Sequence, residues 1–121
     1  MGISVDHVGV SVSDFEKSKA FYLAALAPLG IKLMDDYGTI IGMGDDFPFF
    51  WLSVGDPGHV HLALQASDRA MVDAFFEAAI AAGGTDNGKP GIRADYSPNY
   101  YAAFVLDPDG HNIEVVCHVP G

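Results

Sequence analysis

Two stretches of the chain alternate between aliphatic and small or polar residues. In "HVGVSVSD" (residues 7–14) valines stand at positions 8, 10 and 12, and "HLALQASD" (residues 61–68) repeats the alternation with leucine and alanine. A period of two is typical of a β-strand with one buried face. Each stretch therefore predicts a strand whose aliphatic side chains face the core.

A helical pattern follows each of these strands. Ser13 and Glu16 have the spacing of a capping box, which predicts a helix from about residue 14 to residue 27 that ends at Pro28 and Gly30. In the second copy, Ser67 and Asp68 open a helix over residues 69–82, and Gly83 and Gly84 close it.

The two strand-helix units are copies of one another. Residues 7–30 align with residues 61–84 without a gap, so that His7 pairs with His61. After each helix the chain returns to strands, with a hairpin turn at residues 107–110 in the second half. Aligning the two hairpins puts Trp51 opposite Glu114.

The repeat predicts an α+β fold in a single domain. Two pseudo-symmetric βαβββ modules, about residues 1–55 and 56–121, are expected to form one curved mixed sheet with both helices outside.

Composition narrows the classes of function. The 121 residues are 50% hydrophobic, which suffices for one domain with a core. A net charge of -10 disfavours nucleic acids and anionic membrane surfaces as partners. The single Cys117 cannot form an internal disulfide, and no secretion signal or membrane-spanning stretch is evident, so a cytoplasmic location is expected.

Three polar residues are expected to share one face of the sheet. If the aliphatic positions face the helices, then His7 and His61 point to the opposite side of the sheet. The same alternation along the last strand places Glu114 on that side as well. Two imidazoles and one carboxylate form a facial triad that suits a divalent transition metal.

Simpler interpretations of these residues stay open. A histidine on a strand is often a hydrogen-bonded core residue, and a single glutamate can be solvated or ion-paired. His59 shares the face of His61 and is a substitute ligand. His111, in the hairpin turn, and His118, at the end of the last strand, are expected to be exposed.

With these residues the chain resembles the vicinal oxygen chelate superfamily, which includes glyoxalase, bleomycin-resistance, fosfomycin-resistance and extradiol dioxygenase proteins. The resemblance covers nearly the whole chain and rests on "DHVGVSVSDFEKSKAFY", "HVHLALQASD", "FFWL" and "FVLDPDGHNIEVV". It implies the paired βαβββ modules of the glyoxalase/bleomycin-resistance/dioxygenase fold and metal ligands at His7, His61 and Glu114.

The sequence departs from the glyoxalase pattern at Trp51. The repeat places this residue where a glyoxalase has a fourth ligand, and an indole nitrogen cannot bind a cation. The resemblance therefore implies a glyoxalase-like, divalent-metal-dependent enzyme of the lyase, isomerase, transferase or dioxygenase type. It would chelate a small oxygen-rich substrate to Zn, Mn, Fe, Ni or Co, without being a true four-ligand glyoxalase.

A substrate pocket is expected around the metal ligands. Phe49 and Trp51 share a face and would form an aromatic wall, and Arg93 would bind a substrate carboxylate unless it is simply solvated. Tyr100 and Tyr101 point to opposite faces, so only one of them lines the pocket. The parity of the second strand adds Gln65.

A second function remains open, that of a metal-free protein of the bleomycin-resistance type that binds and sequesters a small molecule. Trp51 and the lack of an evident acid or base favour it. The resemblance also implies a homodimer, in which the modules pair either within one chain or between two.

Overall fold

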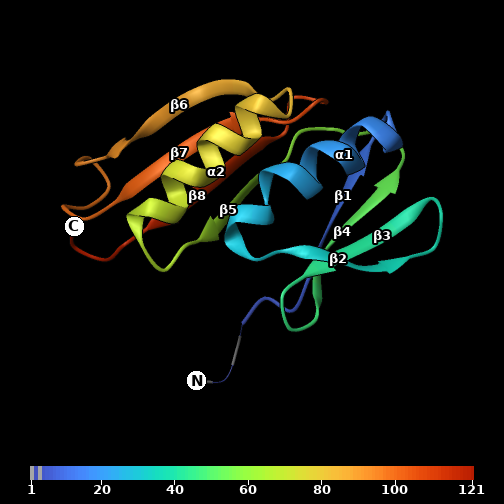
Figure 1. Cartoon of the computed structure of the whole chain (residues 1–121), viewed down its shortest axis with the longest axis horizontal. Helices are drawn as coiled ribbons and strands as arrows, with labels where there is room; N and C mark the ends of the chain where they lie inside the picture. Colours follow the sequence, from blue (N-terminus) through green and yellow to red (C-terminus); the bar gives the residue numbers. More distant parts are fainter. Residues whose placement is uncertain (1, 3) are drawn as a thin grey trace.

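The computed structural model describes Gly2 and residues 4–121. Each half of the chain forms a βαβββ module, as the repeat predicts (Figure 1). The first module contains β1 (Val8–Val12), α1 (Phe15–Ala25), a short 3₁₀ turn (Ala27–Leu29), β2 (Lys32–Asp36), β3 (Ile40–Gly44) and β4 (Pro48–Val54). The second contains β5 (His61–Gln65), α2 (Arg69–Ala81), β6 (Thr85–Ile92), β7 (Tyr101–Leu106) and β8 (Asn112–Cys117).

The strands form two mixed sheets with the same topology. The orders are β1-β4-β3-β2 and β5-β8-β7-β6, and in each sheet the first strand runs parallel to the last strand of its module. The α+β fold class is confirmed, although the described strands form two four-stranded sheets where the repeat suggested one. As a result β1 and β5 each keep one edge that has no strand partner among the described residues.

The strand registers confirm the alignment of the two hairpins. Gly9 on β1 pairs with Trp51 on β4, and Ala63 on β5 pairs with Glu114 on β8. Trp51 therefore occupies in the first module the position that Glu114 occupies in the second.

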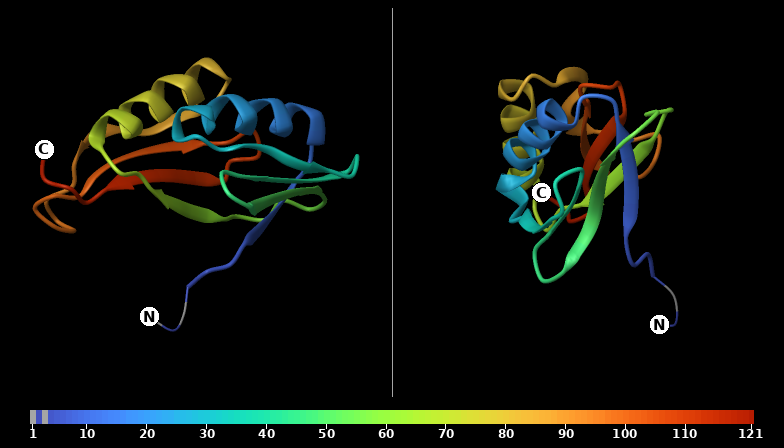
Figure 2. Two further views of the ribbon diagram at one scale, coloured as in Figure 1. Left: turned by 60° about the horizontal axis from the view of Figure 1, so that its bottom comes forward. Right: turned by 90° about the vertical axis from the view of Figure 1, so that its right-hand side faces the viewer.

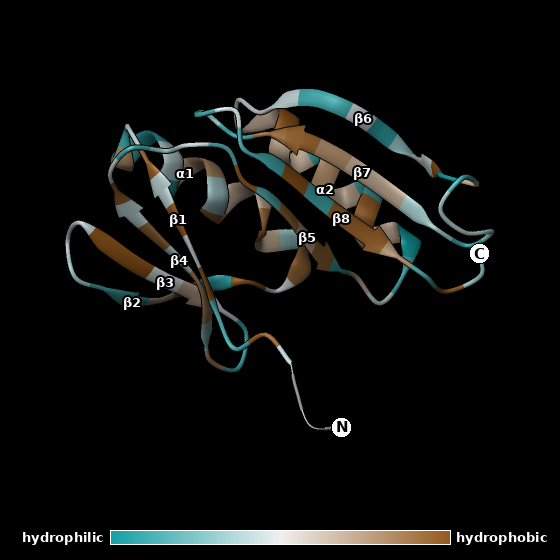
Figure 3. Cartoon of the chain, turned by 180° about the vertical axis from the view of Figure 1, so that it is seen from behind, coloured by the Kyte–Doolittle hydropathy of each residue, from teal (hydrophilic) through white to brown (hydrophobic). Residues whose placement is uncertain are grey.

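Both helices lie on the same side of the sheets, next to one another (Figures 1 and 2). The buried aliphatic and aromatic residues of both modules form one hydrophobic cluster, which includes Val10 and Val12 of β1 and Val115 of β8. Viewed from behind, the molecule shows its sheets with the hydrophilic outer strand β6 (Figure 3). Within the described part of the chain, neither helix has the length and apolarity needed to span a bilayer.

The helix starts differ slightly from the predicted ones. Asp14, not Ser13, caps α1, because its carboxylate accepts a hydrogen bond of 3.1 Å from the Lys17 amide. Ser13 instead donates from its amide and its hydroxyl to Asp109, in the turn between β7 and β8. The expected capping box is thus replaced by a contact between the two modules.

His111 is completely buried, so the prediction that it is exposed is wrong. The Val60 amide donates to its Nδ1 over 3.1 Å, which leaves the proton on Nε2, and Nε2 donates to the Ser11 carbonyl over 2.9 Å. The ring therefore satisfies backbone groups of two distant segments and ties β1 to the turn before β8.

Candidate functional site

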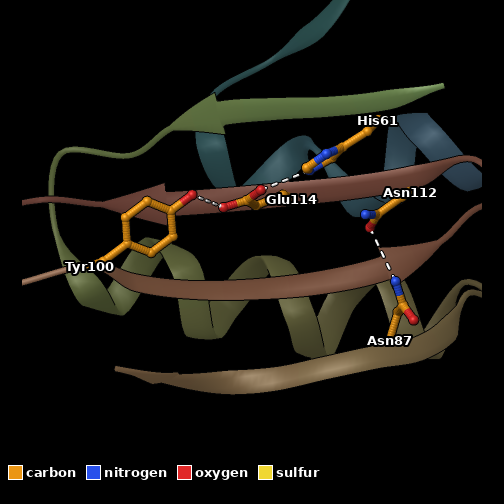
Figure 4. A network of polar contacts seen from close by, with 5 residues as sticks. All are labelled: His61, Asn87, Tyr100, Asn112 and Glu114. Carbon is orange, nitrogen blue, oxygen red and sulfur yellow. Dashed lines mark hydrogen bonds and ion pairs between the residues drawn. The ribbon is translucent and has the colours of Figure 1, made fainter. Parts of the chain in front are cut away.

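A buried carboxylate and a histidine meet on the face of β8 that points away from the helices. Glu114 is only 2% exposed, and its Oε1 lies 2.8 Å from Nε2 of His61 (Figure 4). His61 is the first residue of β5, and its side chain is 56% exposed. The pair thus joins an ionisable group beneath the surface to an accessible ring, both of them common metal ligands.

Tyr100 completes the surroundings of this carboxylate. Its hydroxyl donates to Glu114 Oε2, and this hydrogen bond, together with desolvation, raises the pKa of Tyr100 to about 12 (Figure 4). The rings of Tyr96 and His118 pack edge to face against the Tyr100 ring. Both oxygens of Glu114 therefore have a side-chain partner.

Tyr101 faces the other way, as the alternation along the strand predicts. Its hydroxyl donates to Asp73 on α2 over 2.6 Å, and the Arg69 guanidinium lies 5.0 Å from its ring centre. Tyr100 is therefore the member of the tyrosine pair that belongs to the site, a choice that the sequence left open.

Sequence reasoning missed Phe104, although its position could have been found. Phe104 pairs with Glu114 across β7 and β8 and so lies on the same face. Its ring is 6.4 Å from that of His61 and 5.3 Å from the Arg93 guanidinium. The alternation on β7, once the hairpin is aligned, points to this residue.

Asn112, two residues before Glu114, accepts a hydrogen bond of 3.2 Å from the side-chain amide of Asn87 on β6 (Figure 4).

His7 does not join this group. It lies just before β1, its Nδ1 is 2.8 Å from Asp6 Oδ2, and its side chain is 60% exposed. Among the residues that the structure describes, no three His, Cys, Asp or Glu side chains come close enough to hold a metal ion. One chain thus brings together two of the three expected ligands.

The other expected pocket residues lie elsewhere. Phe49 and His7 line an apolar cavity of about 400 Å³ that extends to Leu62 on β5. Gln65 lines an adjoining hollow of about 270 Å³, which shares Phe49 and Leu64 with that cavity. Trp51 stacks parallel to Tyr37, with ring centres 6.5 Å apart. Within one chain, only Arg93 and Tyr100 of the predicted pocket gather around the His61–Glu114 pair.

Comparison with known proteins agrees with this architecture. Residues 4–115 match the family model of the Glyoxalase/Bleomycin resistance protein/Dioxygenase superfamily. The chain belongs to this superfamily.

Solved structures share the fold over nearly the whole chain. A glyoxalase/bleomycin resistance protein from Albidiferax ferrireducens T118 is 33% identical, with 93% of this chain and 97% of that chain covered and a TM-score of 0.81. A lactoylglutathione lyase from Agrobacterium tumefaciens is 18% identical (94% and 92% covered, TM-score 0.68). TioX from Micromonospora sp. ML1 is 15% identical (97% and 100% covered, TM-score 0.74). The last two show a likeness of fold alone, and no curated protein matches the chain.

Proposed function

We propose that two copies of this chain together form a site for a divalent metal ion, with His61 and Glu114 from one copy and His7 from the other. The metal-bound site would take a small molecule through two neighbouring oxygen atoms. A bound divalent ion would act as a Lewis acid that stabilises negative charge on those oxygens.

The observation that carries this proposal is the buried Glu114 carboxylate beside His61. A buried carboxylate needs compensation, and here both oxygens are bound by side chains, of which that of His61 is 56% exposed. Nε2 of His61 and Oε1 of Glu114 lie 2.8 Å apart and supply two ligand atoms of the kind that bind zinc, manganese, iron, nickel and cobalt. Tyr100 would hold the second carboxylate oxygen in place.

The need for a second copy follows from the position of His7. Its repeat counterpart is His61, yet its ring pairs with Asp6 instead of approaching Glu114. Within the described part of the chain, β1 and β5 both have an edge without a strand partner, and such edges are suited to pairing between copies. A symmetric dimer would bring each His7 to the other copy and form two equivalent sites.

Metal titration of single variants tests which side chains are ligands. We expect His7→Ala and His61→Ala each to weaken Co²⁺ binding at least about tenfold, because loss of even an outer-shell partner commonly costs roughly 10–100-fold. His59→Ala tests the substitute ligand, and it should keep the wild-type affinity, because the histidine that contacts Glu114 is His61 and His59 is exposed. Wild-type affinity in His7→Ala would remove His7 from the site, and a wild-type protein that binds no metal would refute the proposal.

Mixing the two variants tests the sharing of the site between copies. After His7→Ala and His61→Ala proteins are unfolded together and refolded, half of the dimers should be mixed and should contain one intact site. Metal binding should then return to about a quarter of the wild-type amount. If the mixture recovers no binding, the site is not shared between two copies in this way.

A metal-free ligand-binding function is the second candidate. It is favoured by the complete hydrogen bonding of Glu114, which needs no metal to compensate its charge, and by the aromatic pair Trp51 and Tyr37. A protein that stays free of metal in the titration but binds small molecules would support this candidate.

A further inference from the structure

Hydrogen bonds hold the guanidinium of Arg93 in a fixed position near the His61–Glu114 pair. Nη1 donates to the Gly91 carbonyl over 2.9 Å and Nη2 to the Lys89 carbonyl over 2.8 Å. The group also lies 5.3 Å from the centre of the Phe104 ring. These contacts fix both the position and the plane of the side chain.

Two glycines of β6 leave room for this arrangement. A Cβ at Gly88 would lie 3.1 Å from Arg93 Nη2, and a Cβ at Gly91 would lie 3.2 Å from Nη1. Gly88 also has a φ of 153°, which side-chain-bearing residues rarely adopt. The backbone under the guanidinium is therefore adapted to a close approach by a planar group.

Arg93 has no acidic partner among the described residues, in a chain whose net charge is -10. By contrast, Lys19 pairs with Asp36 and Lys89 pairs with Asp86. Two of the five guanidinium N–H groups bind carbonyls, and no other hydrogen bond of this group is found in the described part of the chain. A fixed arginine with donors to spare is suited to binding an anion.

Phe104 lies between the Arg93 guanidinium and the His61–Glu114 pair. Its ring contacts the Arg93 guanidinium on one side and lies 6.4 Å from the His61 ring. A small molecule that spans from His61 to Arg93 across Phe104 would bury apolar surface there. His61, Phe104 and Arg93 thus lie in a row and offer a polar, an apolar and a cationic position.

We propose that Arg93 binds a carboxylate of the small molecule held at the His61–Glu114 site, and that the portion of this molecule next to Phe104 is apolar or aromatic. This assignment deepens the proposed function and rests on it for the identity of the site. A carboxylate fits better than a phosphate, because Lys89 is paired with Asp86 and a second acidic residue, Glu114, lies opposite Phe104 on the same face. A single guanidinium matches one planar, singly charged group.

The test uses benzoate and its neutral analogue benzamide as probes of the full-length, chelator-treated protein. Binding is followed by the movement of backbone amide signals in nuclear magnetic resonance spectra. Because the protein is free of metal, the result does not depend on whether the proposed metal site exists. We expect saturable binding of benzoate with shifts centred on Phe104 and residues 88–93, and binding of benzamide at least about tenfold weaker.

Two variants separate the role of Arg93 from that of the overall charge. Arg93→Gln should weaken benzoate binding at least about tenfold while leaving benzamide unchanged. Lys32→Gln makes the same change of charge in the other module and should stay within about twofold of the wild type. The same spectra report whether each variant is folded.

Three results would overturn the proposal. These are equal affinities for benzoate and benzamide, equal losses in Arg93→Gln and Lys32→Gln, and the absence of saturable shifts near Phe104. A phenyl phosphate that binds more than about tenfold more tightly than benzoate would overturn the choice of a carboxylate.

Discussion

Replacing Tyr22 by phenylalanine should destabilise the protein more than the same replacement at Tyr101. Tyr22 lies on α1, is completely buried, and donates to Asp107 Oδ2 over 2.5 Å. Asp107 is itself buried in the turn before β8, where its other oxygen accepts from the amides of Asp109 and His111. The Tyr22 hydroxyl thus connects the helix of one module to the hairpin of the other.

The magnitude follows from the burial of both partners. A hydrogen bond to a charged group contributes roughly 1.5–3 kcal/mol, and its loss here leaves a carboxylate oxygen without a donor where water has no access. We therefore expect the free energy of unfolding to fall by about 2–3 kcal/mol. For a domain of this size, Tm should fall by about 8–12 °C. The phenylalanine ring would keep its edge-to-face contact with Phe50, which isolates the effect of the hydroxyl.

Urea unfolding at fixed protein concentration measures this change, with Tyr101→Phe as the matched control. Tyr101 also donates to an aspartate, Asp73, over 2.6 Å, but both residues are only half-buried and water can replace the lost bond. Tyr101→Phe should lower the free energy of unfolding by less than about 1 kcal/mol. If Tyr22→Phe costs no more than Tyr101→Phe, then burial does not set the strength of these hydrogen bonds.

Two further predictions concern Tyr100 and Gly84. Because Glu114 raises the folded-state pKa of Tyr100 from 10.0 to about 12, the hydrogen bond contributes its full stability below about pH 10 and loses it as the pH rises through 12. The stability difference between wild type and Tyr100→Phe in urea should therefore shrink between pH 10 and 12, and a constant difference would contradict this reasoning. A Cβ at Gly84 would lie 2.4 Å from Val105 Cγ1, so Gly84→Ala should cost about 1–3 kcal/mol in urea unfolding, whereas Gly9→Ala, whose Cβ meets nothing within 4 Å, should be nearly neutral.

The fold was predictable because both modules carry a strong local pattern. The alternation in β1 and β5, the turns and the repeat identified the βαβββ order, and the repeat also placed Trp51 opposite Glu114. The start of α1 was missed by one residue, because Ser13 has a partner in the other module. A capping signal read from neighbouring residues cannot include an acceptor as distant in the chain as Asp109.

The candidate site was predictable in part for the same reason. Parity along β5 and β8 indicated that His61 and Glu114 share a face, and the structure joins them at 2.8 Å. Parity could not choose between Tyr100 and Tyr101, since adjacent strand residues point to opposite faces whichever face is buried. Contacts with Glu114 on one face and with α2 on the other made that choice.

By itself, then, the sequence determined the modules, their duplication and the residue types at each face, because these depend on periodicity within short segments. Tertiary structure decided which of these residues meet. It buried His111, separated His7 from His61 and Glu114 within one chain, and seated Arg93 on the glycines of β6. Such outcomes depend on the distance between segments far apart in the chain, and a local pattern contains no information about that distance.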